Sequence, residues 1–286
     1  MESTQTLNDL PEVPVVLAIA GHDPSGGAGI HADIEAIVSQ GVHPATAITA
    51  LTVQDTVNVH GFVPSDPKLV IDQALAVLND MPVGAIKIGM LGSVELVEAV
   101  ATVLSRHPEI PVVLDPVLVA GGGGSLGDNA VAAAIVEHLF PRATIVTPNA
   151  HEGRVLAPDA RDLQERGAML SALGAEYVLL KGGDEPGEKV ENWLFGVEPP
   201  RRFVYERLAG QFHGSGCTLS SAIAGLIAQG SDPVNAVHEG LEYTHQTLMH
   251  AAAIGRGQLV PHRLFWADDE GGTDMNDEPP GSSRVH

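Results

Sequence analysis

The sequence predicts one α/β domain in which helices cover both faces of a mainly parallel sheet. Short apolar runs alternate with longer stretches of helical periodicity along almost the whole chain, which is the alternation expected of parallel strands joined by crossover helices. Several of the short runs are apolar at every position. Such runs are typical of strands that are buried on both faces. We find neither an internal repeat nor a linker that would divide the chain.

Six apolar runs predict the strands of the parallel sheet. In chain order they are Val15–Ala20, Thr46–Val53, Ala85–Leu91, Val112–Leu114, Thr144–Thr147 and Tyr177–Leu180. Two later segments, Asn192–Phe195 and Arg202–Tyr205, are joined by a turn around Gly196–Pro200. They predict an antiparallel pair at the edge of the sheet.

Seven stretches with apolar residues at helical spacing predict the helices. In chain order they are Ala28–Gln40, Pro67–Asp80, Val94–Arg106, Asn129–Leu139, Leu163–Leu173, Cys217–Gln229 and Pro233–Ile254. The last helix has a distinct start signal, because Asp232 can cap its N-terminus and Pro233 suits its first position.

The two ends of the chain differ in composition from the rest. We expect residues 1–13 to be a flexible N-terminus and residues 14–266 to form the single domain. Residues 267–286 are rich in Asp, Glu, Gly, Pro and Ser, with almost nothing apolar. Because this composition cannot offset the entropy lost on ordering, it predicts a disordered acidic tail.

Composition also argues against several classes of partner. The chain carries 36 Asp and Glu against 15 Lys and Arg, for a formal net charge of -21, which disfavours nucleic acid or an anionic membrane surface. No apolar run reaches the roughly 20 residues that span a bilayer, and the polar start is not a secretory signal. A single cysteine rules out an intramolecular disulfide. We expect a soluble, cytoplasmic protein with a small-molecule substrate.

The segment His213–Thr218 carries the strongest chemical signal. It reads His-Gly-Ser-Gly-Cys-Thr, contains the only cysteine and precedes an apolar run of helical spacing. Two glycines before a helix let the backbone aim unpaired N–H groups at one point, where the helix dipole adds positive partial charge. The same field favours the thiolate form of Cys217. We predict a phosphate cradle beside a reactive thiol; the alternative is a glycine-rich connection followed by a buried structural cysteine.

Polar and glycine residues follow other predicted strands, at the sheet edge where ligands bind in open parallel sheets. A glycine-rich loop, Gly21–Gly29, follows the first strand, and Asp33 lies in the helix after it. Asp115 follows a central strand and precedes Gly121–Gly124, which predicts a mobile flap or a close approach of backbone to a ligand. Plain surface loops are the alternative. The chain contains neither the dinucleotide fingerprint nor a P-loop.

Hard oxygen ligands are also grouped. Asn149 and Glu152 fall on one face if a helix starts there, and together with Asp115 they could hold Mg²⁺ through water. The alternative is a helix cap and a solvated side chain. Lys181 follows another strand, where it could meet a phosphate. Lys87 lies inside a strand pattern, at the edge of the core or at the surface.

Seven motifs occur together in one order along the chain. They are Gly21–Ile30, Thr49–Gln54, Lys87–Leu91, Asp115–Val117, Thr147–Asn149, Lys181–Gly183 and His213–Leu219. The set closely resembles the hydroxymethylpyrimidine/phosphomethylpyrimidine kinases of thiamine biosynthesis, within the ribokinase-like superfamily. The resemblance implies a three-layer α/β/α sandwich and an ATP- and Mg²⁺-dependent kinase. Such a kinase phosphorylates 4-amino-5-hydroxymethyl-2-methylpyrimidine and then converts the monophosphate to the diphosphate.

The resemblance also implies roles for individual residues. Cys217 would stand at the position of the proposed catalytic base, and Gln54 would hydrogen-bond the aminopyrimidine. The anion hole for the transferring phosphoryl group would consist of Gly214, Ser215 and Gly216. The residues that would line the pyrimidine pocket are Gly21, Asp33, Met90 and Val117. The residues implied to bind ATP and Mg²⁺ are Lys181, Asn149, Asp115 and Glu152.

The chain departs from the common family pattern at several positions. They are His22, Asp55, Asp184, Ser215 and the flap Ala120-Gly121-Gly122-Gly123, which usually reads Ala-Lys-Ser-Gly. The altered flap lacks a cation and a hydroxyl, which bears on ATP affinity and on the second phosphorylation.

Other functions stay open at this point. A pyridoxal or pyridoxine kinase also phosphorylates a hydroxymethyl group on a ring, although Gln54 and Met90 favour the aminopyrimidine. A non-catalytic pyrimidine-sensing protein would keep the pocket and lose catalysis. A dinucleotide-dependent oxidoreductase is disfavoured by the absent fingerprint. Homologues often form homodimers, but no interface can be identified from the sequence.

Overall fold

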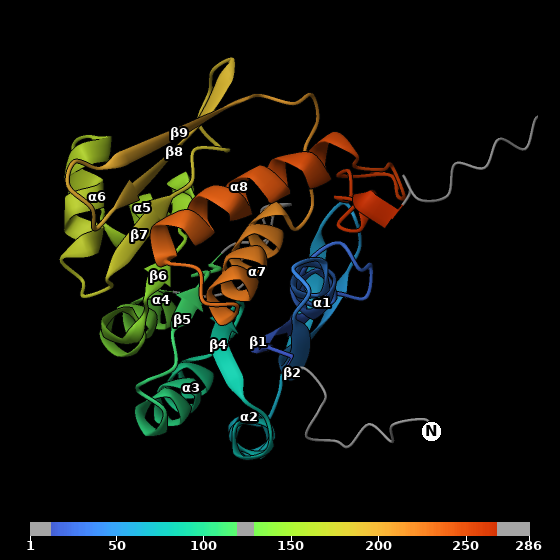
Figure 1. The fold of residues 1–286 in the computed structure, drawn as a ribbon, viewed down its shortest axis with the longest axis vertical. Coiled ribbons are helices and arrows are strands. Elements are labelled where there is room, and N and C mark those ends of the chain that lie inside the picture. The colour runs from blue at the N-terminus through green and yellow to red at the C-terminus, as the bar shows by residue number, and fades with distance from the viewer. Residues whose placement is uncertain (1–12, 119–128, 268–286) are drawn as a thin grey trace, which may run out of the picture.

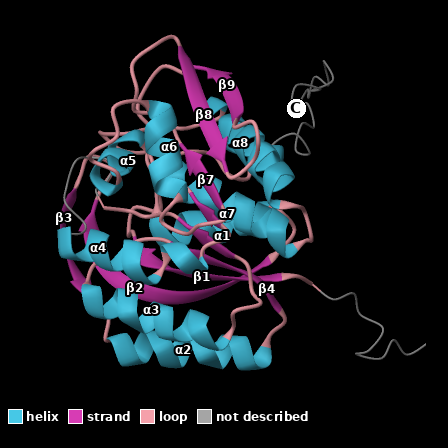
Figure 2. Cartoon of the chain, turned by 90° about the vertical axis from the view of Figure 1, so that its left-hand side faces the viewer, coloured by secondary structure: helices cyan, strands magenta, loops and turns pink. Residues whose placement is uncertain are grey.

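A computed structural model of the chain describes residues 13–118 and 129–267. Within them, one nine-stranded sheet lies between two layers of helices (Figures 1 and 2). The strand order is β3-β2-β1-β4-β5-β6-β7-β8-β9. The strands from β2 to β7 in this order are parallel, and β3, β8 and β9 pair antiparallel at the two edges. The predicted three-layer architecture is confirmed.

The strands follow the predicted order, with one addition. They are β1 (Val15–His22), β2 (His43–Gln54), β3 (Val59–Pro64), β4 (Val83–Ile88), β5 (Val112–Leu114), β6 (Ile145–Val146), β7 (Tyr177–Leu180), β8 (Lys189–Phe195) and β9 (Arg201–Glu206). The six parallel strands and the antiparallel edge pair are confirmed. The sequence reading missed β3, whose short, half-exposed run contains Gly61 and ends in a proline, so that it lacks a strand-like pattern.

The structure contains the seven predicted helices and one further short helix, Ala150–Leu156. They are α1 (Gly29–Ser39), α2 (Pro67–Asp80), α3 (Val94–Arg106), α4 (Asn129–His138), α5 (Ala150–Leu156), α6 (Leu163–Ser171), α7 (Ser215–Ala228) and α8 (Pro233–Met249), with 3₁₀ turns at Phe140–Arg142 and Phe265–Ala267. Helix α8 ends five residues before the predicted Ile254. The reason is that Ala252 exchanges two backbone hydrogen bonds with Val260, which turns the chain away from the helix axis.

Each face of the sheet has its own apolar core. Helices α2, α3, α4 and α6 pack on one face, and α1, α7 and α8 pack on the other. Successive side chains of β1 point to opposite faces of the sheet: Leu17 and Ile19 pack into the first core, and Val16 and Ala18 pack into the second. This explains why the strand is apolar at every position. No helix in the described part of the chain is long and apolar enough to cross a membrane.

Some predictions lie outside the described residues. They concern the flexible N-terminus (apart from Val13), the glycine-rich flap at residues 120–124, and the acidic tail (apart from Ala267).

Candidate active site

The predicted motifs meet at one edge of the sheet. Gln54 ends β2, Asp115 follows β5 and Lys181 follows β7, and the carboxyl ends of these parallel strands lie on the same side. The N-terminus of α7 reaches the same edge, because a Cβ added to Gly216 would lie 3.1 Å from Lys181 Nζ and 3.4 Å from Asp115 Oδ2. Residues far apart in the sequence thus form one site.

The turn before α7 has the shape predicted for an anion cradle. Gly214 is the N-cap, in the left-handed conformation with φ 73°, and no side chain among the described residues caps the helix. A Cβ at Gly214 would lie 2.0 Å from the carbonyl oxygen of Gly27, so only glycine fits. The first amides of α7 are therefore left to bind an anion.

An ion pair with little exposed surface lies beside this cradle. Lys181 Nζ lies 2.9 Å from Asp115 Oδ1, and Thr147 Oγ1 donates to the same oxygen at 3.1 Å. Burial opposes the charge on Lys181, but the carboxylates of Asp115 and Glu152 raise the pKa of this lysine above its usual value. Lys181 therefore stays cationic beside the cradle, as a phosphate-binding site requires.

Asn149 and Glu152 form a capping box at the start of α5. Asn149 Oδ1 accepts the backbone N–H of Glu152, and Glu152 Oε2 accepts the backbone N–H of Asn149, both at 2.8 Å. The helix cap weighed from the sequence is thus confirmed. The prediction of a solvated side chain is wrong, because Glu152 is only 3% exposed. Burial and the Asp115 charge, against the opposing charge of Lys181, raise the pKa of Glu152 to about 7.

The donor set fits an ion that is held largely by water and phosphate. Asp115 and Glu152 supply hard carboxylate oxygens close enough to influence each other's charge. Among the described residues no group of three or more His, Cys, Asp or Glu side chains could hold a metal ion on its own. Mg²⁺ commonly binds through one or two carboxylates together with waters and substrate phosphates, so the two residues are compatible with it.

Cys217 lies in the first turn of α7, but its ionisation differs from the prediction. The residue keeps some exposure. Burial of the thiol and the charges of Asp33 and Asp115 nevertheless outweigh the favourable charge of Lys87 and raise its pKa to about 11. The predicted thiolate is therefore wrong, because neighbouring carboxylates and desolvation overcome the helix N-terminus. Cys217 is a neutral thiol at neutral pH.

Asp33 and Lys87 form a second buried pair. Lys87 Nζ lies 2.7 Å from Asp33 Oδ1, and Ser221 Oγ of α7 donates to the same oxygen at 2.7 Å. The expectation that Lys87 lies at the core edge or the surface is wrong, since its side chain is fully buried. Asp33, implied to line the pyrimidine pocket, also has no exposed surface. The signal for such a pair was present in the sequence, because a lysine inside an apolar strand needs a buried counter-ion.

An apolar cluster lies beside the end of β2. Met90 and Ala50 are buried together, and Val59, Phe62 and Val117 pack against them. A Cβ added to Gly21 would lie 3.2 Å from Met90 Sδ, so Gly21, Met90 and Val117 come together as the resemblance implies. Sequence reasoning missed Phe62 because it missed β3.

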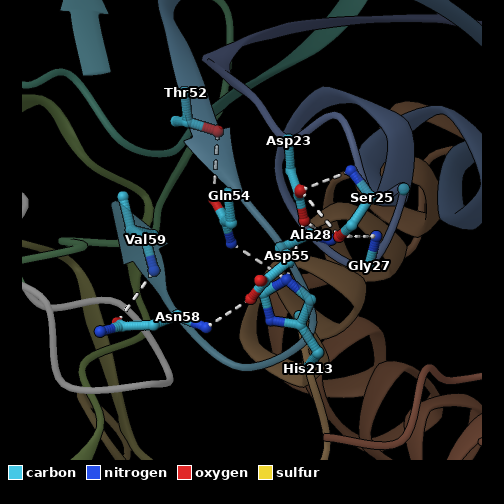
Figure 3. A network of polar contacts seen from close by, with 12 residues as sticks. Asp23, Ser25, Gly27, Ala28, Thr52, Gln54, Asp55, Asn58, Val59 and His213 are labelled. Carbon is cyan, nitrogen blue, oxygen red and sulfur yellow. Dashed lines mark hydrogen bonds and ion pairs between the residues drawn. The ribbon is translucent and has the colours of Figure 1, made fainter. Parts of the chain in front are cut away.

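A hydrogen-bonded network joins the β1–α1 loop to the turn before α7 (Figure 3). His213 Nε2 lies 2.8 Å from Asp23 Oδ2 and 3.0 Å from the Gln54 carboxamide. Both His213 and Asp23 are buried. The sequence analysis placed His213 at the start of the predicted cradle, but it did not single out Asp23 as its partner.

Arg263, in the C-terminal segment, hydrogen-bonds both to the β1–α1 loop and to the first turn of α7. It is 1% exposed, and it donates to the carbonyl oxygens of Gly26 and Gly27, to Thr218 Oγ1 at 2.9 Å and to Glu35. Sequence reasoning missed this residue, because its partners come from distant segments.

The comparison with known families decides the assignment. A family model described as phosphomethylpyrimidine kinase matches residues 23–262. The chain belongs to this family. It is a phosphotransferase with a ribokinase-like fold, as the seven motifs imply.

Curated relatives agree with this assignment. A hydroxymethylpyrimidine/phosphomethylpyrimidine kinase of Synechococcus elongatus is 39% identical over 252 residues, which cover 86% of this chain and 95% of the relative. A thiamine biosynthesis bifunctional protein of Geobacter sulfurreducens is 39% identical over 259 residues, or 89% of this chain. The present chain spans about half of that larger protein, 53% of its length.

The solved structures that the chain resembles include a pyridoxal kinase and a phosphomethylpyrimidine kinase. A pyridoxal kinase of Bacillus subtilis, in complex with ADP, matches with a TM-score of 0.83 and 28% identity, covering 90% of this chain and 99% of that one. A phosphomethylpyrimidine kinase of Clostridium difficile matches with a TM-score of 0.72 and 32% identity, covering 82% of this chain and 99% of that one.

Proposed function

We propose that this kinase uses ATP and Mg²⁺ to phosphorylate 4-amino-5-hydroxymethyl-2-methylpyrimidine and then its monophosphate, giving the diphosphate used in thiamine biosynthesis. The observation that carries this proposal is the Gly214–Gly216 cradle, which lies directly against the Lys181–Asp115 pair. The names of the curated relatives support the substrate. The order of the two steps follows from the chemistry, because the monoester is the acceptor for the second phosphoryl group.

The cradle supplies what phosphoryl transfer requires most. The transition state is loose and carries negative charge on the equatorial oxygens, so alignment and electrostatic stabilisation provide most of the catalysis. The amides at the start of α7 and the Lys181 ammonium are placed to stabilise that charge. Mg²⁺, held by Asp115, Glu152 and Asn149 with bound water, would neutralise the phosphates of ATP.

Cys217 then has a limited role as a base. Because its thiol is neutral at neutral pH, it does not remove the proton of the alcohol in advance. In a loose transition state the new P–O bond forms late, and so does the need for proton removal. We therefore assign more of the rate to the cradle than to Cys217.

Pyridoxal kinase is the second candidate. The pyridoxal kinase of Bacillus subtilis has the higher TM-score of the two structures compared, and its named substrate is also a ring alcohol. The Gln54 carboxamide favours the aminopyrimidine, because it can pair with an amino group and the adjacent ring nitrogen at once.

Chromatographic analysis of products separates the two. The purified chain is incubated with ATP and the hydroxymethylpyrimidine, and in parallel with ATP and pyridoxal, each with and without Mg²⁺. Mg²⁺-dependent monophosphate followed by diphosphate supports the proposal. Monophosphate alone limits the protein to the first step, and pyridoxal phosphate alone favours the second candidate. The Gly216→Val variant controls for a contaminating kinase, because its bulk fills the cradle.

A further inference from the structure

The Asp23 carboxylate fixes the proton on His213. Asp23 Oδ1 accepts from the Ser25 amide and hydroxyl at 2.8 Å each, and Oδ2 accepts from the Ala28 amide at 2.9 Å (Figure 3). Burial would raise the pKa of Asp23, but the hydrogen bonds from His213 and Ser25 outweigh it and hold the pKa below its usual value. An ionised carboxylate can only accept, so the His213 Nε2 that faces it at 2.8 Å must carry a proton.

The protonated Nε2 in turn determines which end of the Gln54 carboxamide faces His213. A nitrogen that donates to Asp23 has no lone pair left, so it cannot accept from an amide NH₂. The carboxamide atom 3.0 Å from His213 Nε2, placed as Nε2, must therefore be the oxygen, and it shares the single Nε2–H with Asp23 in a three-centre hydrogen bond. The oxygen and nitrogen of an amide side chain are distinguished only by such partners.

Thr52 supports the same orientation independently. Its single hydroxyl proton is donated to the carbonyl oxygen of His22 at 2.9 Å. The hydroxyl keeps its proton for this shorter bond, and the carboxamide atom of Gln54 that lies 3.2 Å from Thr52 Oγ1 then donates to a lone pair of the hydroxyl. With the carboxamide turned in this way, each contact has one donor and one acceptor.

We propose that His213 is a positioning residue for substrate recognition: held as an N–H donor by Asp23, it fixes the Gln54 carboxamide with its oxygen toward the imidazole and its NH₂ toward Thr52. This inference rests on the proposed function. One carboxamide lone pair and one N–H stay available, and they complement the ring nitrogen and neighbouring amino group of a 4-aminopyrimidine. Pyridoxal has no amino group beside its ring nitrogen and would leave them unpaired.

The network also connects recognition with the anion cradle. His213 directly precedes the N-cap Gly214, and its backbone N–H donates to the carbonyl oxygen of Leu259 at 2.8 Å. Its imidazole packs on Gly27, where an added Cβ would lie 2.0 Å from Cδ2. The same side chain therefore aligns the pyrimidine-binding amide with the turn that receives the phosphoryl group.

Kinetics of five variants tests whether His213 acts through Gln54. Removing a positioned hydrogen bond to a substrate-binding group typically costs about tenfold in affinity, so we expect His213→Ala to raise KM for the hydroxymethylpyrimidine about tenfold. It should lower the preference over pyridoxal by a similar factor. In a Gln54→Ala background the same change should add little, because coupled residues are not additive. His213→Gln, which restores an N–H donor, should recover most of the loss. His60→Ala is the control, since His60 also pairs with an aspartate, Asp55, but is exposed.

A spectroscopic measurement on the full chain tests the inference without measuring activity. Nitrogen-15 NMR of labelled histidine, assigned by the missing signal of His213→Gln, should show a protonated Nε2 on His213. A deprotonated Nε2, or equal KM penalties in the wild-type and Gln54→Ala backgrounds, overturns the inference. If the wild-type chain phosphorylates neither compound, the proposed function fails, and the NMR result alone decides the state of His213.

Discussion

Lys87 Nζ lies 2.7 Å from Asp33 Oδ1, and neither side chain has any exposed surface. The pair joins β4 to α1, and Ser221 adds a hydrogen bond from α7. Burial opposes the charge on Lys87, but the negative charges around it raise its pKa above the usual value. A permanent cation is therefore buried near Cys217, and Asp33 is its hydrogen-bonded counter-ion.

Removing that cation should destabilise the fold strongly. Breaking a buried ion pair leaves an uncompensated charge and typically costs about 3–5 kcal/mol, so we expect Lys87→Met to lower the free energy of unfolding by about that much. Urea denaturation measures it. Lys68→Met is the matched control, because the Lys68–Asp72 pair is exposed, and it should leave the stability unchanged. A Lys87→Met variant as stable as wild type would show that the pair does not stabilise the fold.

The raised pKa of Cys217 predicts slow alkylation of the native protein. With a pKa of about 11, few molecules carry a thiolate at pH 8, whereas an unfolded cysteine ionises near pH ~8.5. We expect iodoacetamide to modify the native chain roughly a hundredfold more slowly than the urea-unfolded chain. The sole cysteine makes the mass-spectrometric readout unambiguous. Equal rates would show that Cys217 is a reactive thiolate in the folded protein, as the field of the helix N-terminus alone predicts.

The parts of this molecule that sequence could predict depend on local pattern. The burial of β1 on both faces and the start of α8 at Asp232 can be read from neighbouring residues. The charge state of the site cannot be read from neighbouring residues. Asp23 and His213 are 190 positions apart, and Asp33 and Lys87 are 54 apart. The helix-terminal field at Cys217 was visible in the sequence, but the carboxylates that oppose it come from other elements.

The cradle should matter more for turnover than the thiol beside it. A Cβ at Gly216 would already lie 3.1 Å from Lys181 Nζ and 3.4 Å from Asp115 Oδ2, and valine adds two methyl groups beyond it. Gly216→Val should therefore reduce kcat by about a thousandfold, at the upper end of losing an oxyanion donor. Cys217→Ser keeps the backbone amides and should cost only about tenfold. Steady-state kinetics with saturating ATP gives both values, and circular dichroism confirms folding. Equal losses in two folded variants would contradict this ranking.

Gly27 should tolerate no side chain, although its backbone is not left-handed. An added Cβ would lie 2.0 Å from His213 Cδ2, so Gly27→Ala should displace the imidazole. Overpacking of this kind costs about 1–3 kcal/mol, and it should also raise KM for the pyrimidine. Gly183→Ala is the control, because an added Cβ there meets nothing within 4 Å. Thermal unfolding and KM are measured on both. A Gly27→Ala variant with wild-type KM would show that the His213 position is not critical for binding.

Glu152 should make the protein less stable as pH rises from about 4.5 to 7. Its pKa is raised from 4.5 to about 7 in the folded state, mainly by burial. In that pH window the folded state holds a proton that the unfolded state has lost, so stability falls as pH increases and levels off above the folded pKa.

The effect can be isolated with Glu152→Gln, which keeps an acceptor for the Asn149 amide but has no charge to lose. The variant should gain roughly 3 kcal/mol over wild type between pH 5 and pH 8, measured by urea denaturation at each pH. Glu165 occupies the same position of α6, but hydrogen bonds from Arg161 lower its pKa. For Glu165→Gln the difference from wild type should therefore have the opposite sign. Parallel pH profiles for Glu152→Gln and wild type would show that Glu152 ionises normally and presents a charged carboxylate to Mg²⁺ at neutral pH.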